Sequence, residues 1–200
     1  MKPKLIAQGA EAKIFLSNEI INKDRIPKGY RHPQLDKQIR TRRTRSESKI
    51  LIKAKEAGVN IPKVYETNKF DIKIEFIEGD RLSETLNDYP EKKQFETMKQ
   101  LGKQTAILHE NNLIHGDLTT SNTILKGDKV FVIDFGLGFV STKQEDKAVD
   151  LHLIKQALEA KHFQNHEALF KEFCKGYKWE DAEKIIDRLV VVEKRGRYKH

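Results

Sequence analysis

The sequence lacks the features of a membrane-bound or disulfide-bonded protein. Cys174 is its single cysteine, so an internal disulfide is excluded, and no metal-ligand neighbours accompany it. No uncharged run approaches the ~20 apolar residues of a membrane-spanning helix, and residues 1–4 do not lead into the apolar stretch of a signal peptide. We therefore expect a cytoplasmic protein with no membrane partner, in which Cys174 packs on an amphipathic helix.

The chain also has no internal repeat or low-complexity linker, and its 200 residues suit one domain with a sizeable core. Positive charge, by contrast, is in excess and unevenly spread. Ten Lys or Arg residues stand between Lys23 and Lys49 against three acids, and Lys194 to His200 adds four more cations. A charge run is usually a solvated face, but two basic blocks in an otherwise balanced chain indicate a polyanionic partner such as nucleic acid.

Residues 113–136, LIHGDLTTSNTILKGDKVFVIDFG, contain the clearest motif. Asp117 closes a His-Gly-Asp triplet, Asn122 follows five residues later, and Asp134 opens an Asp-Phe-Gly triplet after an apolar run. This spacing is typical of the catalytic loop and metal-binding segment of protein kinases. One triplet alone would favour ordinary loop and turn residues. All three together predict phosphoryl transfer, with Asp117 as the base and Asn122 and Asp134 as magnesium ligands.

The N-terminal part supplies a possible partner for that motif. Apolar alternation predicts strands near residues 5–6, 12–16, 20–21, 64–65 and 72–76, and helical spacing predicts a helix from about Leu35 to Ala57. Lys23 ends the third strand, and Glu47 lies on the apolar stripe of the helix. A carboxylate on a buried stripe is costly unless a cation meets it. We therefore predict a Lys23–Glu47 ion pair, with both residues in the catalytic site.

Two further segments are assigned to nucleotide binding. The turn from Gln8 to Ala12 stands where kinases have a glycine-rich phosphate cover, although it has one glycine and could be a plain turn. Residues 75–79 leave the sheet where a kinase-like fold has its hinge. The predicted nucleotide-binding residues are Ile6, Gly9, Ala10, Glu11, Ala12, Ile14, Lys23, Glu75, Ile77 and Ile124.

The predicted helix also contains four closely spaced arginines, which cannot all face the core. Several should therefore be free to meet a phosphate backbone or a protein neighbour. The predicted nucleic-acid contacts are Arg40, Arg43, Lys194, Arg195, Arg197 and Lys199.

The remaining pattern predicts a shortened second lobe. Helical spacing covers residues 95–108 and recurs at about 146–160, 166–175 and 181–194. Only fifteen residues separate Asp134 from Asp150, no Ala-Pro-Glu follows, and Gly116 replaces the arginine of many regulated kinases. We expect an α+β, reduced bilobal protein-kinase-like fold in one domain, with an antiparallel N-lobe over 1–76, a mainly helical C-lobe over 77–193 and a basic tail over 194–200.

Several segments together resemble one family. QGAEA (8–12), KGYRHP (28–33), HGDLTTSN (115–122), IDFGLG (133–138), EDKAVDL (145–151) and the terminal RGR (195–197) are similar to the small atypical kinase/ATPase subunit of the KEOPS complex, also called PRPK. The resemblance implies ATP and magnesium as cofactors, serine autophosphorylation, and ATP hydrolysis that supports N6-threonylcarbamoyladenosine formation in tRNA. It implies three partners: the transferase subunit, a small subunit that binds the N-lobe, and tRNA at the basic tail.

Two other functions remain open from the sequence. Aminoglycoside and choline kinases use the same triplet and five-residue step, but they have a longer C-lobe with an acidic pocket for cationic substrates. A non-catalytic scaffold that binds tRNA and proteins would have no need of Lys23, Glu47, Asp117, Asn122 and Asp134 together.

Overall fold

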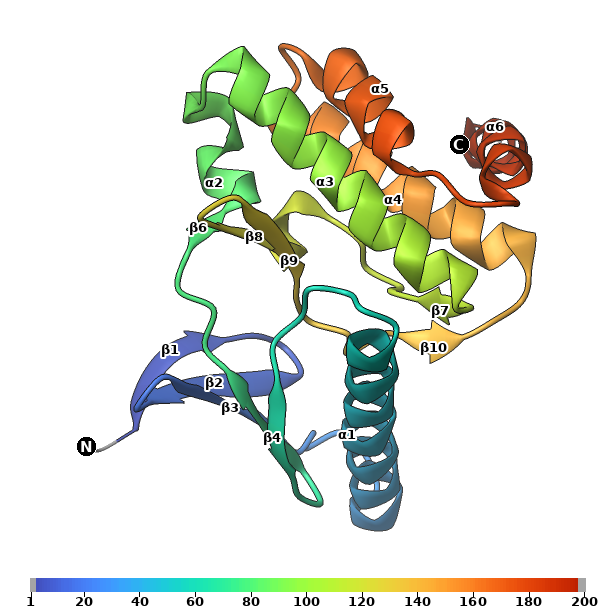
Figure 1. Cartoon of the computed structure of the whole chain (residues 1–200). Helices are drawn as coiled ribbons and strands as arrows, with labels where there is room; N and C mark the ends of the chain where they lie inside the picture. The colour runs from blue at the N-terminus through green and yellow to red at the C-terminus, as the bar shows by residue number, and fades with distance from the viewer. Residues whose placement is uncertain (1–2, 198–200) are drawn as a thin grey trace.

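The computed structural model, which describes residues 3–197, consists of a sheet-containing N-lobe below a mainly helical C-lobe (Figure 1). The N-lobe sheet has the strand order β1-β2-β3-β5-β4, and all its neighbours are antiparallel. Its strands are β1 Lys4–Gln8, β2 Ala12–Ser17, β3 Ile20–Arg25, β4 Val64–Thr67 and β5 Asp71–Glu75. This confirms the predicted antiparallel N-lobe.

The β2–β3 hairpin sets the position of Lys23. Its two turn residues, Asn18 and Glu19, both have positive φ, which matches the twist of a two-residue hairpin. The register places Lys23 opposite Ile14 on one side and Ile72 on the other. Lys23 was predicted at the end of its strand, but β3 continues to Arg25, so Lys23 lies inside the sheet.

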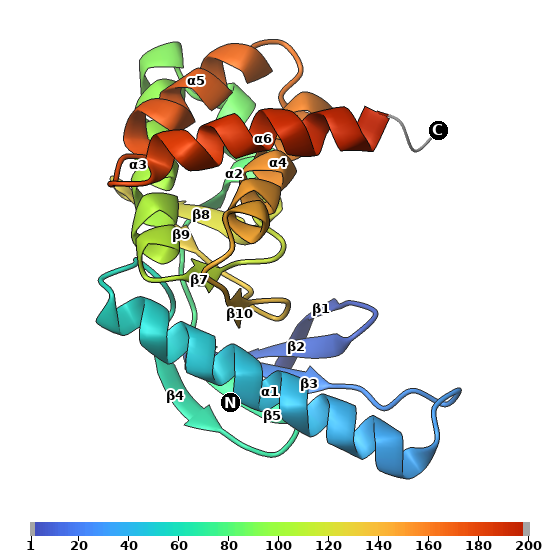
Figure 2. The same cartoon turned by 90° about the vertical axis from the view of Figure 1, so that its right-hand side faces the viewer.

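Helix α1, Pro33–Glu56, is the single long helix of the N-lobe and runs along one side of the sheet (Figure 2). Proline at its first position suits a helix start, because the missing N–H has no helical partner there. Gly58 lies just after the end of the helix, and its N–H donates to Lys55 O at 3.0 Å. The predicted bounds were therefore close to the observed ones.

The C-lobe is built around three pairs of packed elements. Helix α3 packs on α5 at a close approach, because a Cβ added at Gly102 would lie 2.0 Å from Phe173 O. Helix α4 packs on α6, and α3 also covers β9. The elements are β6 Asp80–Arg81, α2 Leu82–Thr85, η1 Leu86–Asp88, α3 Glu91–Glu110, β7 Leu113–Ile114, η2 Thr120–Asn122, β8 Thr123–Lys126, β9 Lys129–Val132, β10 Phe139–Val140, α4 Gln144–Lys161, α5 His166–Gly176 and α6 Ala182–Arg197.

The C-terminal helices agree with the predicted ones, with one difference. Cys174 packs against the core from α5, and burial raises the pKa of its thiol to about 11. The predicted boundary at Lys194 lies inside α6, which continues to Arg197. Residues 194–197 are therefore the last turn of a helix rather than a separate tail. No helix in the described range 3–197 is long and apolar enough to cross a membrane.

The two lobes are joined through Asn60, which follows α1. Its backbone oxygen accepts a hydrogen bond from Val132 N at 2.9 Å, and its side chain donates to Val130 O at 3.2 Å. Its own N–H donates to Gln104 Oε1 at 2.6 Å. Strand β9, which leads into Asp134, is thereby tied to the N-lobe.

Candidate phosphoryl-transfer site

The backbone of the loop that carries Asp117 is hydrogen-bonded to a buried carboxylate. Asp150 of α4 accepts hydrogen bonds from His115 N at 2.6 Å and from Gly116 N at 2.8 Å. Asp150 and His109, which lies 3.3 Å away, have fully buried side chains. Asp150 therefore has a structural role, because it accepts hydrogen bonds from two loop amides that would otherwise lack partners.

The backbone conformation at position 116 requires glycine, which explains why no arginine precedes Asp117. Its φ is +79°, and a Cβ there would lie 2.5 Å from Leu137 O. Any side chain at this position would be strained and would collide with the segment after the Asp-Phe-Gly triplet. The absence of arginine before Asp117 is thus required by the close approach of two chain segments.

His115 links this loop to the strand that ends at Asp134. Its Nδ1 accepts a hydrogen bond from Asp117 N at 3.2 Å, so its Nε2 carries the proton and donates to Ile133 O at 3.0 Å. Ile133 N in turn donates to Asn122 O at 2.9 Å. His115 therefore braces the catalytic loop and brings the two halves of the motif together.

Asp117 and Asn122 form a directly bonded pair. Asn122 Nδ2 donates to both the backbone O and the Oδ2 of Asp117, each at 2.9 Å. Because the amide nitrogen is used in this way, the amide oxygen of Asn122 is the group left to bind a cation. Asp117 is exposed to solvent, so an incoming hydroxyl group can reach its carboxylate.

The predicted Lys23–Glu47 pair forms, at 2.7 Å, inside a larger charge cluster. Lys23 Nζ also lies 2.6 Å from Asp134 Oδ1, and Arg25 donates from Nη2 to the other oxygen of Glu47. The side chain of Glu47 is 2% exposed and that of Asp134 is 50% exposed. The Glu47 carboxylate is therefore buried and has a structural role, whereas the Asp134 carboxylate is accessible from solvent.

The charge cluster raises the pKa of Lys23 and lowers the pKa of Asp134. Burial lowers the pKa of the Lys23 ammonium, but the carboxylates of Glu47 and Asp134 outweigh it, and the net pKa is raised. Burial raises the pKa of Asp134, but the charge and hydrogen bond of Lys23 outweigh it, and the net pKa is lowered. Both groups are therefore charged across the neutral range.

Arg25 is the site residue that sequence reasoning missed. It is 4% exposed and bonds the same carboxylate as Lys23. A signal for it existed, because residues i and i+2 of a strand point to the same face, and Arg25 follows Lys23 by two. The strand prediction stopped too early for that rule to be applied.

The donor set fits magnesium held together with phosphate oxygens. Asn122 and Asp134 offer hard oxygen ligands, which this ion prefers. Within residues 3–197 no group of three or more His, Cys, Asp or Glu forms a metal site of its own. A cation at Asn122 and Asp134 would thus need further ligands from a nucleotide or water.

The predicted phosphate cover is a tight turn at the edge of the sheet. Gly9 N donates to Ala12 O at 3.0 Å, and the side chain of Lys28 donates to Ala10 O. Glu11 is drawn toward α1, where its carboxylate lies 2.7 Å from Arg43 Nη1. This side chain is therefore engaged by the helix in the structure.

The other predicted nucleotide residues lie on three strands and on the link between the lobes. Ile6 and Ile14 lie on β1 and β2, and Ile124 lies on β8, whose neighbour β9 leads to Asp134. Glu75 N donates to Lys63 O at 2.9 Å, so an adenine contact by Glu75 must use its carbonyl oxygen. Ile77, in the link between the lobes, is 4% exposed.

Arg40 and Arg43, which were predicted to contact nucleic acid, are each paired with a carboxylate in the structure. Arg40 Nε lies 2.6 Å from Asp36 Oδ2, and its guanidinium stacks 3.9 Å from the Phe70 ring. Arg43 is paired with Glu11. Both arginines face the N-lobe because they precede Glu47 by seven and four residues, which is the spacing of one helix face.

The predicted nucleic-acid residues at the C-terminus are only partly described. Arg195 Nη1 lies 2.7 Å from Glu145 Oε1, and Lys194 is exposed on the last turn of α6. Arg197 is described as part of the helix backbone, and Lys199 lies outside the described residues.

Comparison with known proteins identifies the family. The model of the RIO domain matches residues 16–152. The KEOPS complex subunit Bud32 of Pyrococcus abyssi is 43% identical, over 98% of this chain and 96% of its own length. A protein of Archaeoglobus fulgidus named "Probable serine/threonine-protein kinase BUD32 homolog" is 36% identical, over 95% of this chain and 94% of its own length.

A longer relative comes from Methanosarcina mazei and is named "Probable bifunctional tRNA threonylcarbamoyladenosine biosynthesis protein". It is 36% identical over 98% of this chain, which spans only 36% of that protein.

Solved structures agree on the fold at low sequence identity. The Rio2 kinase–ADP/Mg2+–phosphoaspartate complex of Chaetomium thermophilum has a TM-score of 0.63 at 12% identity, over 97% of this chain and 70% of that one. The aminoglycoside phosphotransferase APH(2'')-Ib with ADP has a TM-score of 0.58 at 16% identity, over 96% of this chain and 92% of that one. The fold is therefore kinase-like, and by sequence the chain belongs to the RIO-domain family and, within it, to the Bud32 proteins.

Proposed function

We propose that this chain is an ATP- and magnesium-dependent atypical serine/threonine kinase that works as an ATPase subunit of a KEOPS complex. The observation that carries the proposal is the meeting of Lys23, Glu47 and Asp134 in one cluster, 2.7 and 2.6 Å from the Lys23 ammonium. This cluster adjoins the braced loop that holds Asp117 and Asn122. A protein catalyses phosphoryl transfer mainly by positioning the reacting groups and by stabilising their charge, and these residues can do both.

Each residue then has a defined task. Lys23 contacts phosphate oxygens while Glu47 and Arg25 fix its position from behind. Asp117, oriented by Asn122, accepts or directs the proton of the attacking hydroxyl group. Asn122 and Asp134 would hold magnesium, which would neutralise charge on the phosphate oxygens.

The biological setting is inferred from the names of the relatives. Bud32 of Pyrococcus abyssi is named as a subunit of the KEOPS complex, and the Methanosarcina protein is named for threonylcarbamoyladenosine biosynthesis in tRNA. We propose the same modification for this chain in the cytoplasm. Its partners would be tRNA, the transferase subunit and a small subunit on the N-lobe. The short segment after Asp134 favours turnover with water or a partner's serine over phosphorylation of many peptide substrates.

The site is tested by two substitutions, Asp117→Ala and Asp134→Ala, with Asp128→Ala as the matched control. Asp128 is an exposed aspartate in the turn between β8 and β9. We expect both site variants to lose magnesium-dependent ATP turnover, by about 10²–10⁴-fold for the base. Asp117→Ala should keep the melting temperature of the control, whereas Asp134→Ala also removes an ion pair of Lys23 and should lower it. Retained turnover in both site variants would remove this assignment.

The complex is tested by measuring ATP consumption by the chain alone, with tRNA, and with the transferase subunit. We expect the additions to change the rate. A chain that is fully active alone and indifferent to both additions would contradict the role as a complex subunit.

A further inference from the structure

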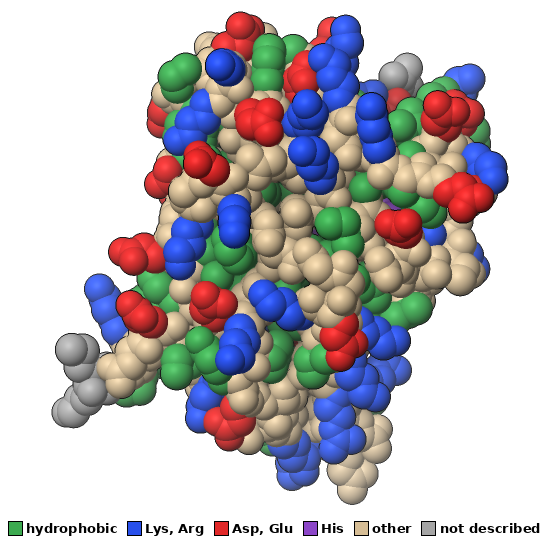
Figure 3. Space-filling model, viewed as in Figure 1, with side chains coloured by type: hydrophobic (Ala, Val, Ile, Leu, Met, Phe, Trp, Pro, Cys, Tyr) green, Lys and Arg blue, Asp and Glu red, His purple; other side chains and the backbone are tan. Residues whose placement is uncertain are grey.

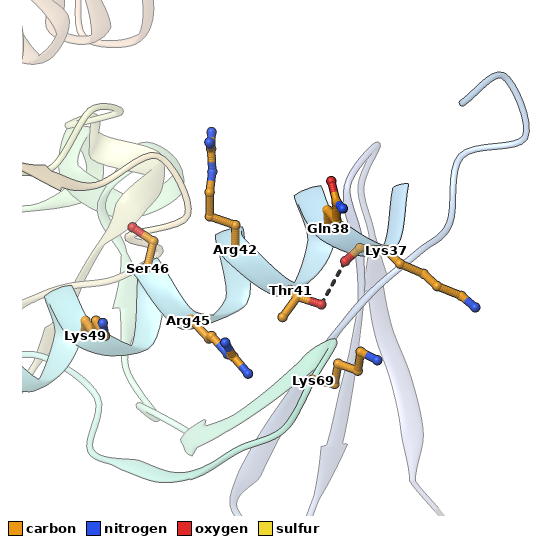
Figure 4. A pocket seen from close by; sticks show the side chains of 8 residues that line it. All are labelled: Lys37, Gln38, Thr41, Arg42, Arg45, Ser46, Lys49 and Lys69. Atoms are coloured by element: carbon orange, nitrogen blue, oxygen red, sulfur yellow. Dashed lines mark hydrogen bonds between the residues drawn. The ribbon is translucent and has the colours of Figure 1, made fainter. Parts of the chain in front are cut away.

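A hollow outside the phosphoryl-transfer site lies along the outer face of α1. It has a volume of about 550 Å³ and is lined by seven residues of α1 and one from the bend between β4 and β5. The lining residues are Lys37, Gln38, Thr41, Arg42, Arg45, Ser46, Lys49 and Lys69. Arg45 and Lys69 extend from the two sides toward the same space (Figure 4). The hollow is thus a cationic groove between a helix and a loop.

Five of these eight residues are cations, and none of the five forms an ion pair with a described residue. Lys37, Arg42, Arg45, Lys49 and Lys69 are all exposed. Figure 3 shows Lys and Arg side chains gathered over the lower right of the molecule, where Figure 1 places α1. Like charges held together without a carboxylate repel one another, so the groove carries a local positive potential.

The chemistry of the lining excludes the usual centre of a protein interface. Such centres contain aromatic or aliphatic anchors and few lysines, whereas no lining residue of this groove is aromatic or aliphatic. The three uncharged residues, Gln38, Thr41 and Ser46, carry hydrogen-bonding groups of the kind that bind phosphate and sugar oxygens. The groove is therefore suited to a hydrophilic polyanion.

The cations also form a row. Arg42 and Arg45 lie between Lys37 and Lys49, and those two ends are twelve residues apart, which is about 18 Å along a helix. A row of this length matches a polymer with regularly repeated charges better than a single small anion. Lys69 adds a cation beside the row.

We infer that the outer face of α1 binds the phosphate backbone of RNA. The choice of RNA among polyanions rests on the proposed function in tRNA modification; the location rests on the groove alone. Glu47 projects from the opposite face of the same helix into the phosphoryl-transfer site, so RNA and nucleotide can be bound at the same time. The groove takes the place of Arg40 and Arg43 as the N-lobe contact to nucleic acid.

The test is a triple substitution, Arg42→Gln, Arg45→Gln and Lys49→Gln, measured for binding of a fluorescent tRNA transcript between about 50 and 500 mM salt. Each lost phosphate contact lowers the salt slope by about 0.7–0.9. We expect a slope reduced by about 2–3 and binding weakened at least about tenfold near 0.1 M salt. A second variant, Arg42→Lys and Arg45→Lys, keeps the charges and should keep most of the affinity.

The matched control removes three exposed cations from the C-lobe, by Lys92→Gln, Lys103→Gln and Lys171→Gln. Equal weakening by both triple variants, or no effect of the α1 variant, would overturn the proposal. Competition by poly-glutamate as effective as that by RNA would instead assign the groove to acidic proteins and also overturn it.

The failure of this inference can be separated from that of the proposed function. The α1 variant should keep its magnesium-dependent ATP turnover in the absence of RNA, whereas Asp117→Ala should lose turnover and keep RNA binding. Loss of RNA affinity in Asp117→Ala equal to that of the α1 variant would contradict a separate groove.

Discussion

Both faces of helix α1 carry cations, but the cations of the two faces differ in what they contact. On the inner face Asp36 pairs with Arg40, Glu11 pairs with Arg43, and Glu47 receives both Lys23 and Arg25. On the outer face the cations of the RNA groove form no ion pair with any of residues 3–197. The inner face therefore uses its charges for folding and catalysis, and the outer face leaves them available to a ligand.

This difference shows why a count of charges in a sequence says little about binding. The block from Lys23 to Lys49 holds ten cations against three acids, yet every acid in it except Asp24 is buried in an ion pair. Neutralised cations cannot attract a polyanion over distance. The binding potential of the block comes from the fraction of its cations that the fold leaves unpaired.

The largest effect is expected from Glu47→Ala on the inner face. It would leave Lys23 and Arg25 buried, 8% and 4% exposed, without their shared carboxylate. Removing one partner of a buried ion pair costs about 3–5 kcal/mol of unfolding free energy. Urea denaturation would measure the loss. Its outer-face counterpart, Lys49→Ala, should change stability by no more than about 0.5 kcal/mol. Similar losses of unfolding free energy in Glu47→Ala and Lys49→Ala would contradict the claim that only the inner face uses its charges for folding.

A smaller effect is expected from Arg25→Met, which keeps the Lys23–Glu47 pair but removes the second cation on Glu47. A hydrogen bond to a charged group contributes about 1.5–3 kcal/mol, so stability should fall by that amount. Because Glu47 would be held less firmly, ATP turnover should also fall, by about tenfold, as for other residues that orient a ligand. Arg42→Met is the control on the outer face. Unchanged turnover in Arg25→Met would show that Lys23 alone orients Glu47.

The stability of the protein should depend on pH through Asp36. The hydrogen bond from Arg40 lowers its pKa below the ordinary value of 3.8, burial opposes this, and the Lys28 N–H adds to the lowering. A lowered folded-state pKa gives stability that is fully present above 3.8 and is lost as pH falls through the folded-state value. The melting temperature of Asp36→Asn should therefore lie below that of wild type at pH 7, and the gap should close at acid pH.

A residue on the outer face of α1 serves as the control for this measurement. Lys49→Gln should show no such closing, because it removes no carboxylate. If the difference in melting temperature between wild type and Asp36→Asn stays constant down to acid pH, the charge of the Asp36 carboxylate does not contribute to stability.

The smallest effect is expected on the outer face, from Arg45→Gln. Arg45 and Lys49 are like charges four residues apart, and such pairs cost about 0.2–0.5 kcal/mol. Their removal should raise stability by that amount at low salt and have no effect at about 1 M salt, where the repulsion is screened. Thermal melts at two salt concentrations would measure this. Destabilisation by Arg45→Gln at low salt would indicate an internal partner for this arginine.

Much of the site could be predicted because its residues are marked by local spacing. The steps from His115 to Asp117 and Asn122, and the Asp-Phe-Gly triplet, are short-range patterns fixed by one loop and one strand end. The Lys23–Glu47 pair could be predicted because a carboxylate on an apolar helix stripe needs a cation. The same spacing places Arg40 and Arg43 on the face of Glu47, because they precede it by seven and four residues.

The sequence by itself determined the lobes, the motif residues and the helix that carries Glu47, because these depend on periodicity and on spacing within single elements. Only the tertiary structure decided which carboxylates meet which cations. Lys23 meets Asp134 although 111 positions separate them, and Lys69 joins the row on α1 because the bend between β4 and β5 lies beside that helix. Such meetings depend on how elements pack, and periodicity along one element contains no information about its neighbours.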